Sequence, residues 1–261
     1  MAMYEGLDAI RVERRGSVLW VSMDKEERPN ADLTRIFREV NNDPDTRVVV
    51  LTGAAEKVFC VGGGGGGHID NSEMGRNAYW YHGMQLARDV IVSALECEKP
   101  IVGRINGHAV GKGCSIALCC DITVMAEEAK IGDTHVKVGL ACGDGGSLLW
   151  PYIVGPLLAR RFLLTGDLLT GREAERIGLV TEAVPRAELD ARTDYWAGRL
   201  MEGSPSAVTM TKRALSAWVR AQAGEHLDMS LGLETLTFLT EDHREGAAAL
   251  GERRAPQFTG R

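Results

Sequence analysis

Three closely spaced glycines between two apolar segments constrain this chain more than any other feature. The apolar segments cover residues 100–105 and 116–125, and Gly107, Gly111 and Gly113 lie between them. Because glycine lacks Cβ, a ligand can approach its backbone closely and reach its N–H groups. A strand, a glycine turn and a helix start also bring unpaired amide donors to the positive end of a helix dipole. The pattern indicates either tight packing or an oxyanion hole, in which fixed donors bind a carbonyl oxygen that gains negative charge.

The composition is that of a globular chain with a full hydrophobic core. Of its 261 residues, 44% are hydrophobic and 25% are charged, as expected for one large domain or a domain with an appendage. The net charge of −6 argues against a nucleic acid or an anionic membrane as partner. No apolar run approaches the roughly 20 residues of a membrane-spanning helix.

The cysteines and the N-terminus bear on the compartment. The 6 cysteines include no Cys-x-x-Cys pair and no His/Cys cluster at metal spacing, and several lie inside apolar segments. This distribution is typical of buried thiols in a reducing compartment. Residues 1–6 lack the basic and apolar regions of a signal peptide. We therefore expect a cytoplasmic protein that binds no metal.

Hydrophobic periodicity predicts an α/β core followed by a helical tail. A hairpin turn is expected at residues 15–17, and the continuous apolar run at 47–52 is typical of a parallel strand covered on both faces. The predicted strands cover residues 10–13, 18–23, 47–52, 101–105 and 180–184. The predicted helices cover residues 33–40, 74–95, 113–120, 155–164, 172–177, 189–202, 206–221 and 227–239.

The glycine segment resembles the second oxyanion segment of the crotonase (enoyl-CoA hydratase/isomerase) superfamily. Residues 106–114 read Asn-Gly-His-Ala-Val-Gly-Lys-Gly-Cys, and Cys-Asp follows at 120–121, against the family's Asn-Gly-x-Ala-x-Gly-Gly-Gly-Cys and Cys-Asp. Further matches follow in chain order at residues 48–53, 163–167, 174–180, 241–246 and 256–258. The resemblance implies an α/β fold with a crotonase-like ββα spiral core over residues 1–186. It also implies a C-terminal helical trimerisation region over 187–261, and hence a homotrimer or a hexamer built as a dimer of trimers.

The resemblance also assigns the two donors of the oxyanion hole. The family's first oxyanion segment is matched here by Phe-Cys-Val followed by the glycines of residues 62–67, which makes the N–H of Val61 the first donor. The second donor is the N–H of Lys112, where the family has glycine. Gly62 and Gly111 are then expected beside the bound carbonyl. The glycine run could instead be a flexible loop without a contact role.

Coenzyme A is the ligand that the resemblance implies. In the family, Arg-x-Asn-Ala lies beside the nucleotide part of coenzyme A, so Arg28, Asn30 and Ala31 are expected to contact it. The following helix is shorter than in the family, because Asp-Pro already arrives at residues 43–44, and this changes one side of the acyl pocket. The implied substrate is an acyl-CoA or a small carbonyl compound, with coenzyme A as part of the substrate and no tightly bound cofactor.

The residues that would perform the chemistry depart from the hydratase pattern. Hydratases of the superfamily use two glutamates that activate one water as general acid and base, and here those positions hold Ser115 and His135. A histidine with a carboxylate partner can act as a general base near neutral pH. We therefore expect His135 as the base and Asp144 as its partner. The alternative is that His135 only packs and Asp144 caps the helix that begins near Gly146.

Three functions remain open on these residues. The first is acyl-CoA chemistry, hydration or isomerisation through a thioester enolate, and Arg28 with the Asn-Ala turn favours it. The second is hydrolysis of a C–C bond in a β-diketone, of the retro-Claisen type, with His135 and Asp144. The third is a catalytically inactive acyl-CoA-binding homologue. If His135 is structural, Glu234 or His68 is the next candidate base, although a solvent-exposed helix face is the simpler expectation for Glu234.

Overall fold

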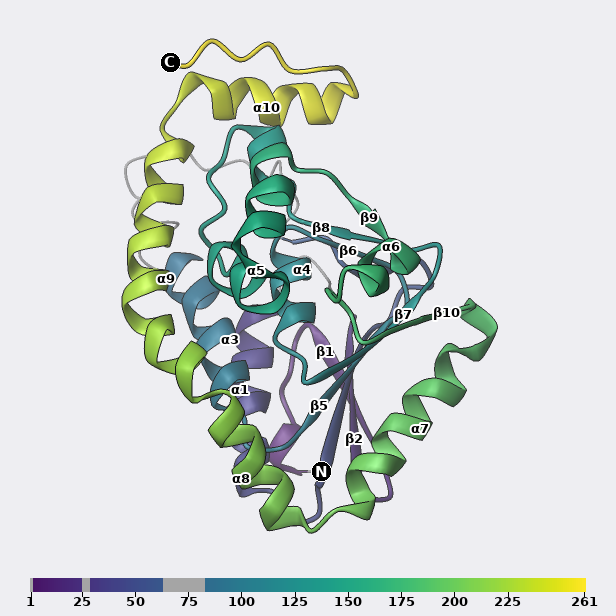
Figure 1. The fold of residues 1–261 in the computed structure, drawn as a ribbon. Helices are drawn as coiled ribbons and strands as arrows, with labels where there is room; N and C mark the ends of the chain where they lie inside the picture. The colour runs from purple at the N-terminus through teal and green to yellow at the C-terminus, as the bar shows by residue number, and fades with distance from the viewer. Residues whose placement is uncertain (1, 25–28, 63–82) are drawn as a thin grey trace.

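The computed structural model describes residues 2–24, 29–62 and 83–261, and its core is built on two sheets (Figure 1). The larger sheet has the strand order β1-β2-β3-β5-β7-β10, and the smaller has the order β4-β6-β8-β9. The strands of the larger sheet are β1 (Ile10–Arg15), β2 (Val18–Met23), β3 (Val48–Gly53), β5 (Ile101–Ile105), β7 (Ile122–Ala126) and β10 (Glu182–Val184). The strands of the smaller sheet are β4 (Val58–Cys60), β6 (His108–Val110), β8 (Lys130–Gly132) and β9 (Leu169–Thr170).

The chain passes repeatedly from the larger sheet to the smaller one. Strands β3, β5 and β7 are parallel neighbours, and each is followed directly by a strand of the smaller sheet, β4, β6 and β8 in turn. Only the β1–β2 hairpin of the larger sheet is antiparallel, as its pattern predicts. This repetition confirms the crotonase-like spiral.

Helices cover both faces of the larger sheet (Figure 1). The α-helices of the described residues are α1 (Asn30–Glu39), α3 (Met84–Glu96), α4 (Lys112–Leu118), α5 (Gly146–Thr165), α6 (Gly171–Arg176), α7 (Leu189–Glu202), α8 (Pro205–Leu215), α9 (Ala217–Phe238) and α10 (Glu241–Glu252). Every residue of β3 is buried, and its side chains alternate: Val49 and Leu51 pack in the core that includes α1, α3 and α9, while Val48 and Val50 pack toward α7. The alternation follows from the two-residue period of a strand. The continuous apolar run at residues 47–52 therefore indicates a strand that is buried on both faces.

Several predicted helix boundaries are corrected by the structure. The helix expected at 206–221 is two helices, because α8 ends at Leu215 and α9 begins at Ala217. The segment 227–239 is the second half of α9, and the segment 155–164 is the second half of α5, which has a kink at Gly155 (φ 79°). Of the helix expected at 74–95, only the part from residue 83 onward lies among the described residues.

The helical tail packs on the core of its own subunit. Leu189 and Ala197 of α7 are buried against the larger sheet, directly after the predicted boundary at residue 186. On α9, Leu227 is fully buried, whereas Leu236 is 62% exposed, so only part of its apolar surface belongs to the subunit core. No helix in the described ranges is both long enough and apolar enough to cross a bilayer.

Candidate active site

The first turn of α4 is pressed against the end of β4. A Cβ added to Gly113 would lie 1.8 Å from the carbonyl oxygen of Cys60, so no side chain fits at this position. Gly111, between β6 and α4, has φ 57°, which favours glycine. A Cβ on Gly111 would lie 3.5 Å from Cε1 of His135. The glycines thus allow β4, α4 and His135 to meet at one place.

The two predicted oxyanion donors come from the segments that meet there. Lys112 is the first residue of α4, so its N–H has no acceptor four residues earlier within the helix. Gly62 has φ 77°, and a Cβ built on it would lie 3.7 Å from the Lys112 nitrogen. Val61 directly precedes Gly62 and has a 40% exposed side chain. The structure brings these backbones side by side, as two converging donors require.

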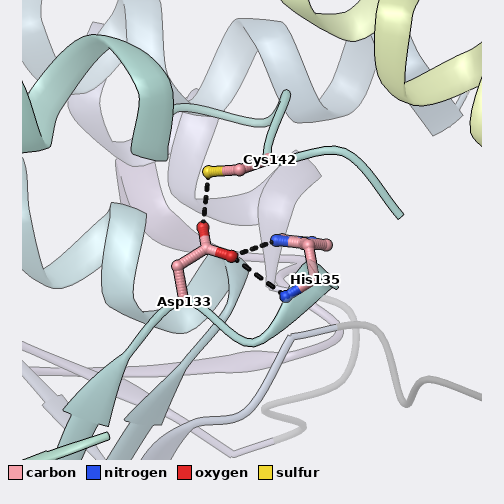
Figure 2. Close-up of side chains that lie close together, drawn as sticks. All are labelled: Asp133, His135 and Cys142. Carbon is pink, nitrogen blue, oxygen red and sulfur yellow. Dashed lines mark hydrogen bonds and ion pairs between the residues drawn. The ribbon is translucent and has the colours of Figure 1, made fainter. Parts of the chain in front are cut away.

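His135 is held by a carboxylate that the sequence analysis did not single out. Its Nδ1 lies 2.6 Å from Oδ1 of Asp133, and its backbone N–H donates to the same oxygen over 3.1 Å (Figure 2). The thiol of Cys142 donates to the other oxygen, Oδ2, over 2.8 Å. Burial alone would raise the pKa of Asp133, but the charge of His135 and these hydrogen bonds lower it. An ionised Asp133 fixes the proton on Nδ1 and leaves Nε2 toward the site.

On its Nε2 side, His135 faces two further carboxyl groups. Asp144 Oδ2 lies 3.7 Å from Nε2, and Glu234 Oε1 lies 3.9 Å from it. The three atoms lie within 4.8 Å of one another. Asp144 also accepts a hydrogen bond of 3.5 Å from the hydroxyl of Ser115, and it does not cap α5, whose N-cap is Gly145 without a side-chain bond.

Glu234 corrects the expectation of a solvent-exposed helix face. It is only 4% exposed, and its Oε2 has no hydrogen-bond partner among the described residues. Both Glu234 and Ser230 belong to α9, and the Ser230 hydroxyl fixes that helix here by donating to the carbonyl of Gly143 over 2.7 Å. A Cβ on Gly143 would lie 2.7 Å from Glu234 Oε2. This close contact brings α9 to the segment that carries Asp144.

The ionisable groups of the site shift one another strongly. Burial alone would lower the pKa of His135, but Asp144, Asp133 and Glu234 together raise it to about 10. Burial, followed by the charge of Asp144, raises the pKa of Glu234 to about 8. Burial lowers the pKa of the Lys112 ammonium, against the opposite effect of Asp144 and Glu234. At neutral pH the site therefore holds an imidazolium and a protonated Glu234.

Two groups of side chains in the described part of the chain have metal-ligand spacing. Asp133, His135 and Cys142 form one, but their ligand atoms are engaged with one another at 2.6 and 2.8 Å. The second consists of His135, Asp144 and Glu234, beside the Lys112 ammonium. A cation already present near this second group disfavours a divalent ion. A water molecule is the better match to its hydrogen-bonding atoms.

The expected coenzyme A contacts are only partly described. Asn30 and Ala31 form the first turn of α1, and the Asn30 Oδ1 is buried without a hydrogen-bond partner among the described residues. Arg28, His68 and the glycines 63–67 lie outside the described residues.

Comparison with known proteins identifies the family. The sequence profile described as Enoyl-CoA hydratase/isomerase matches residues 14–261. The chain belongs to this family. It is 35% identical to an (E)-benzylidenesuccinyl-CoA hydratase from Thauera aromatica, over 96% of this chain and 99% of that relative. It is 32% identical to a crotonyl-CoA hydratase from Syntrophomonas wolfei subsp. wolfei, over 84% and 83%.

Solved structures of the enoyl-CoA hydratase/isomerase family have the same fold. A crystal structure of an enoyl-CoA hydratase/isomerase from Mycobacterium paratuberculosis superimposes with a TM-score of 0.85 at 29% identity, covering 94% of this chain and 99% of that chain. The chain is thus an enzyme of the crotonase superfamily. In this chain, the two oxygens of Asp144 contact Ser115 and His135, respectively.

Proposed function

We propose that this enzyme adds water across the α,β double bond of an enoyl-CoA thioester. One observation carries the proposal: the Asp144 carboxylate lies 3.5 Å from the Ser115 hydroxyl and 3.7 Å from Nε2 of His135. Those two side chains stand where the hydratase pattern has its glutamates. A carboxylate between the two positions can hold and deprotonate the water that two glutamates would otherwise share.

The reaction begins with the thioester oxygen in the oxyanion hole. The N–H groups of Val61 and Lys112 bind that oxygen. Asp144 takes a proton from water, and the water oxygen forms a bond to the β-carbon. The π electrons of the double bond move toward the carbonyl, and the enolate oxygen that forms is stabilised by the two N–H donors. Protonation of the α-carbon then gives the 3-hydroxyacyl thioester.

The structure changes the role that we propose for His135. The sequence favoured His135 as the base, with Asp144 as its partner. With a pKa of about 10, however, His135 is already protonated at neutral pH and cannot accept a proton in its resting state. We propose that Asp144 is the base. The imidazolium, oriented by Asp133, stabilises the carboxylate and carries protons.

The substrate class follows from the family and its relatives. Relatives named for the hydration of crotonyl-CoA and of an aryl-substituted enoyl-CoA support a short or aryl-bearing 2-enoyl-CoA. Arg28, Asn30 and Ala31 would contact its nucleotide part, and no tightly bound cofactor is needed. We further propose a homotrimer or a hexamer, with the core at residues 1–186 and the assembly region at 187–261. Exposed leucines support this assembly: Leu233 and Leu236 on α9, and Leu239 directly after it.

A second candidate function is hydrolysis of a C–C bond in a β-diketone. The short hydrogen bond between Asp133 and His135 favours it, because a carboxylate-oriented histidine is a common base for activating water. The raised pKa of His135 argues against it, since the hydrolytic base must be neutral before the reaction. An inactive acyl-CoA-binding homologue would turn over neither substrate.

The experiment compares the substrates on one purified protein. Loss of the ultraviolet absorbance of the conjugated enoyl thioester reports hydration of crotonyl-CoA and of benzylidenesuccinyl-CoA, and a β-diketone is assayed in parallel. Hydration that falls about a hundredfold or more in Asp144→Asn supports the proposal. The control is Asp167→Asn, which removes an exposed carboxylate beside Lys137. Turnover of the diketone alone would establish the hydrolase instead.

A further inference from the structure

We infer that Glu234 is a third catalytic group, which delivers a proton to the α-carbon. His135 then resets the site: its Nε2 gives a proton to Glu234 and takes up from Asp144 the proton that came from water. This inference rests on the proposed hydration and assigns the group that protonates the α-carbon. Asp144 lies between Ser115 and His135 and is engaged as the base, so a separate acid has to complete the addition.

The geometry singles out Glu234 as that acid. Its carboxyl group comes from α9, 90 residues after Asp144 in the chain, yet its Oε1 lies 3.9 Å from Nε2 of His135. The side chain is almost fully buried, and its second oxygen has no partner among the described residues. An ionised carboxylate without partners is costly in such a place, whereas a neutral carboxyl group is tolerated and can donate. Burial thus keeps a transferable proton at the site.

Three groups, Asp144, Glu234 and His135, account for every proton that moves in the reaction. Asp144 takes H⁺ from water as the remaining hydroxide oxygen bonds to the β-carbon. The carboxyl proton of Glu234 then bonds to the α-carbon, and the enolate electrons restore the thioester carbonyl. Asp144 is now protonated and Glu234 is ionised. Nε2 of His135 lies 3.7 Å from one carboxylate and 3.9 Å from the other, so it can give its proton to Glu234 and take the proton of Asp144.

The electrostatics of the site support this direction of transfer. Burial and the charge of Asp144 favour the neutral form of Glu234, whose pKa is about 8. The positive charges of His135 and Lys112 favour its ionised form and limit the increase. The ionisable groups that face Glu234 from neighbouring elements are His135, Asp133, Asp144, Cys142 and Lys112. An acid with a pKa near the working pH transfers its proton efficiently in both directions.

The test uses the full-length enzyme and three variants. Glu234→Gln keeps the size of the side chain but cannot supply the acidic proton. Glu234→Asp keeps the acid on a shorter arm. Glu225→Gln removes an exposed glutamate from the same helix and serves as the matched control. Circular dichroism and thermal melting establish that each variant is folded.

We expect Glu234→Gln to lower kcat by about a hundredfold or more, with a much smaller change in KM. Glu234→Asp should recover part of the rate. In the wild type, hydration should decline as pH rises through about 8, as Glu234 loses its proton. That decline should be absent in Glu234→Gln. Exchange of the α-proton of the 3-hydroxyacyl product with deuterated solvent should slow in Glu234→Gln to a similar degree as hydration.

The outcomes distinguish failure of the role of Glu234 from failure of the proposed hydration. Full activity in a folded Glu234→Gln, with an unchanged pH profile, overturns the role of Glu234 and leaves hydration by Asp144 in place. Failure of Glu234→Asp to recover any rate, together with a pH profile in Glu234→Gln like that of the wild type, shows a structural role only. A wild type that hydrates no enoyl thioester overturns both.

Discussion

Asp133→Asn is the most informative single substitution at this site. It preserves the size of the side chain and removes the charge that lies 2.6 Å from Nδ1 of His135. A hydrogen bond to a charged partner contributes about 1.5–3 kcal/mol, and 1.36 kcal/mol corresponds to one pH unit in a pKa. Asn at this position can also present its N–H₂ group, which favours the wrong tautomer of the imidazole. The pKa of His135 should therefore fall by about one to two pH units from its value of about 10.

Nuclear magnetic resonance of histidine labelled with ¹³C at the imidazole ring measures this pKa directly. The enzyme has 6 histidines, and His135→Ala identifies the signal of interest. We also expect kcat to fall at least tenfold, because the imidazolium loses its orientation. The control is Asp167→Asn. The Asp167 carboxylate pairs on the exposed surface with Lys137, which shares the short 3-10 helix His135–Val138 with His135. An unchanged or higher pKa of His135 in Asp133→Asn would refute the reasoning.

Three further predictions concern stability, packing and assembly. In the folded enzyme the pKa of His135 is raised above the unfolded value of 6.5, so its contribution to the free energy of unfolding is complete below pH 6.5 and is lost as pH rises toward about 10. Urea titrations at several pH values should show this decline in the free energy of unfolding. His135→Ala should make that free energy depend less on pH. Gly113→Ala should lower the melting temperature and abolish activity because of the Cys60 contact, whereas Gly251→Ala, in open space on α10, should be neutral or slightly stabilising. Light scattering should give a trimer or hexamer that Leu236→Glu dissociates, and a stable wild-type monomer at micromolar concentration would contradict it.

Most strands of the larger sheet were predictable because strand patterns are local, whereas the spiral arrangement was implied by the family resemblance. Alternating or continuous apolar runs of four to six residues marked β1, β2, β3 and β5, and the glycines between β5 and α4 marked the turn. The break between α8 and α9 was not predictable from period, since Ser216 interrupts the helix without a glycine or proline. Boundaries of this kind are set by tertiary packing.

The acid groups of the site were harder to predict. Asp133 lies two residues before His135, and that spacing gives no regular-structure signal in a loop. On α9 the sequence favours the wrong face, because Leu233 and Leu236 are exposed while Glu234 is buried. The buried face follows the positions i, i+3, i+4 and i+7 from Leu227, and Glu234 is the last of them. Reading this stripe with its polar members included would have pointed to Glu234.

The place of Asp144 between Ser115 and His135 also limits how the active site can be redesigned. Replacing both of those residues by glutamate would put two more carboxyl groups next to Asp144 and Glu234, and would remove the cation that Asp144 now faces. Like charges at such distances oppose each other's ionisation. We therefore expect a variant that carries the glutamate pair and still keeps Asp144 to be inactive. Directed evolution between the two designs has to vary position 144 together with the other two.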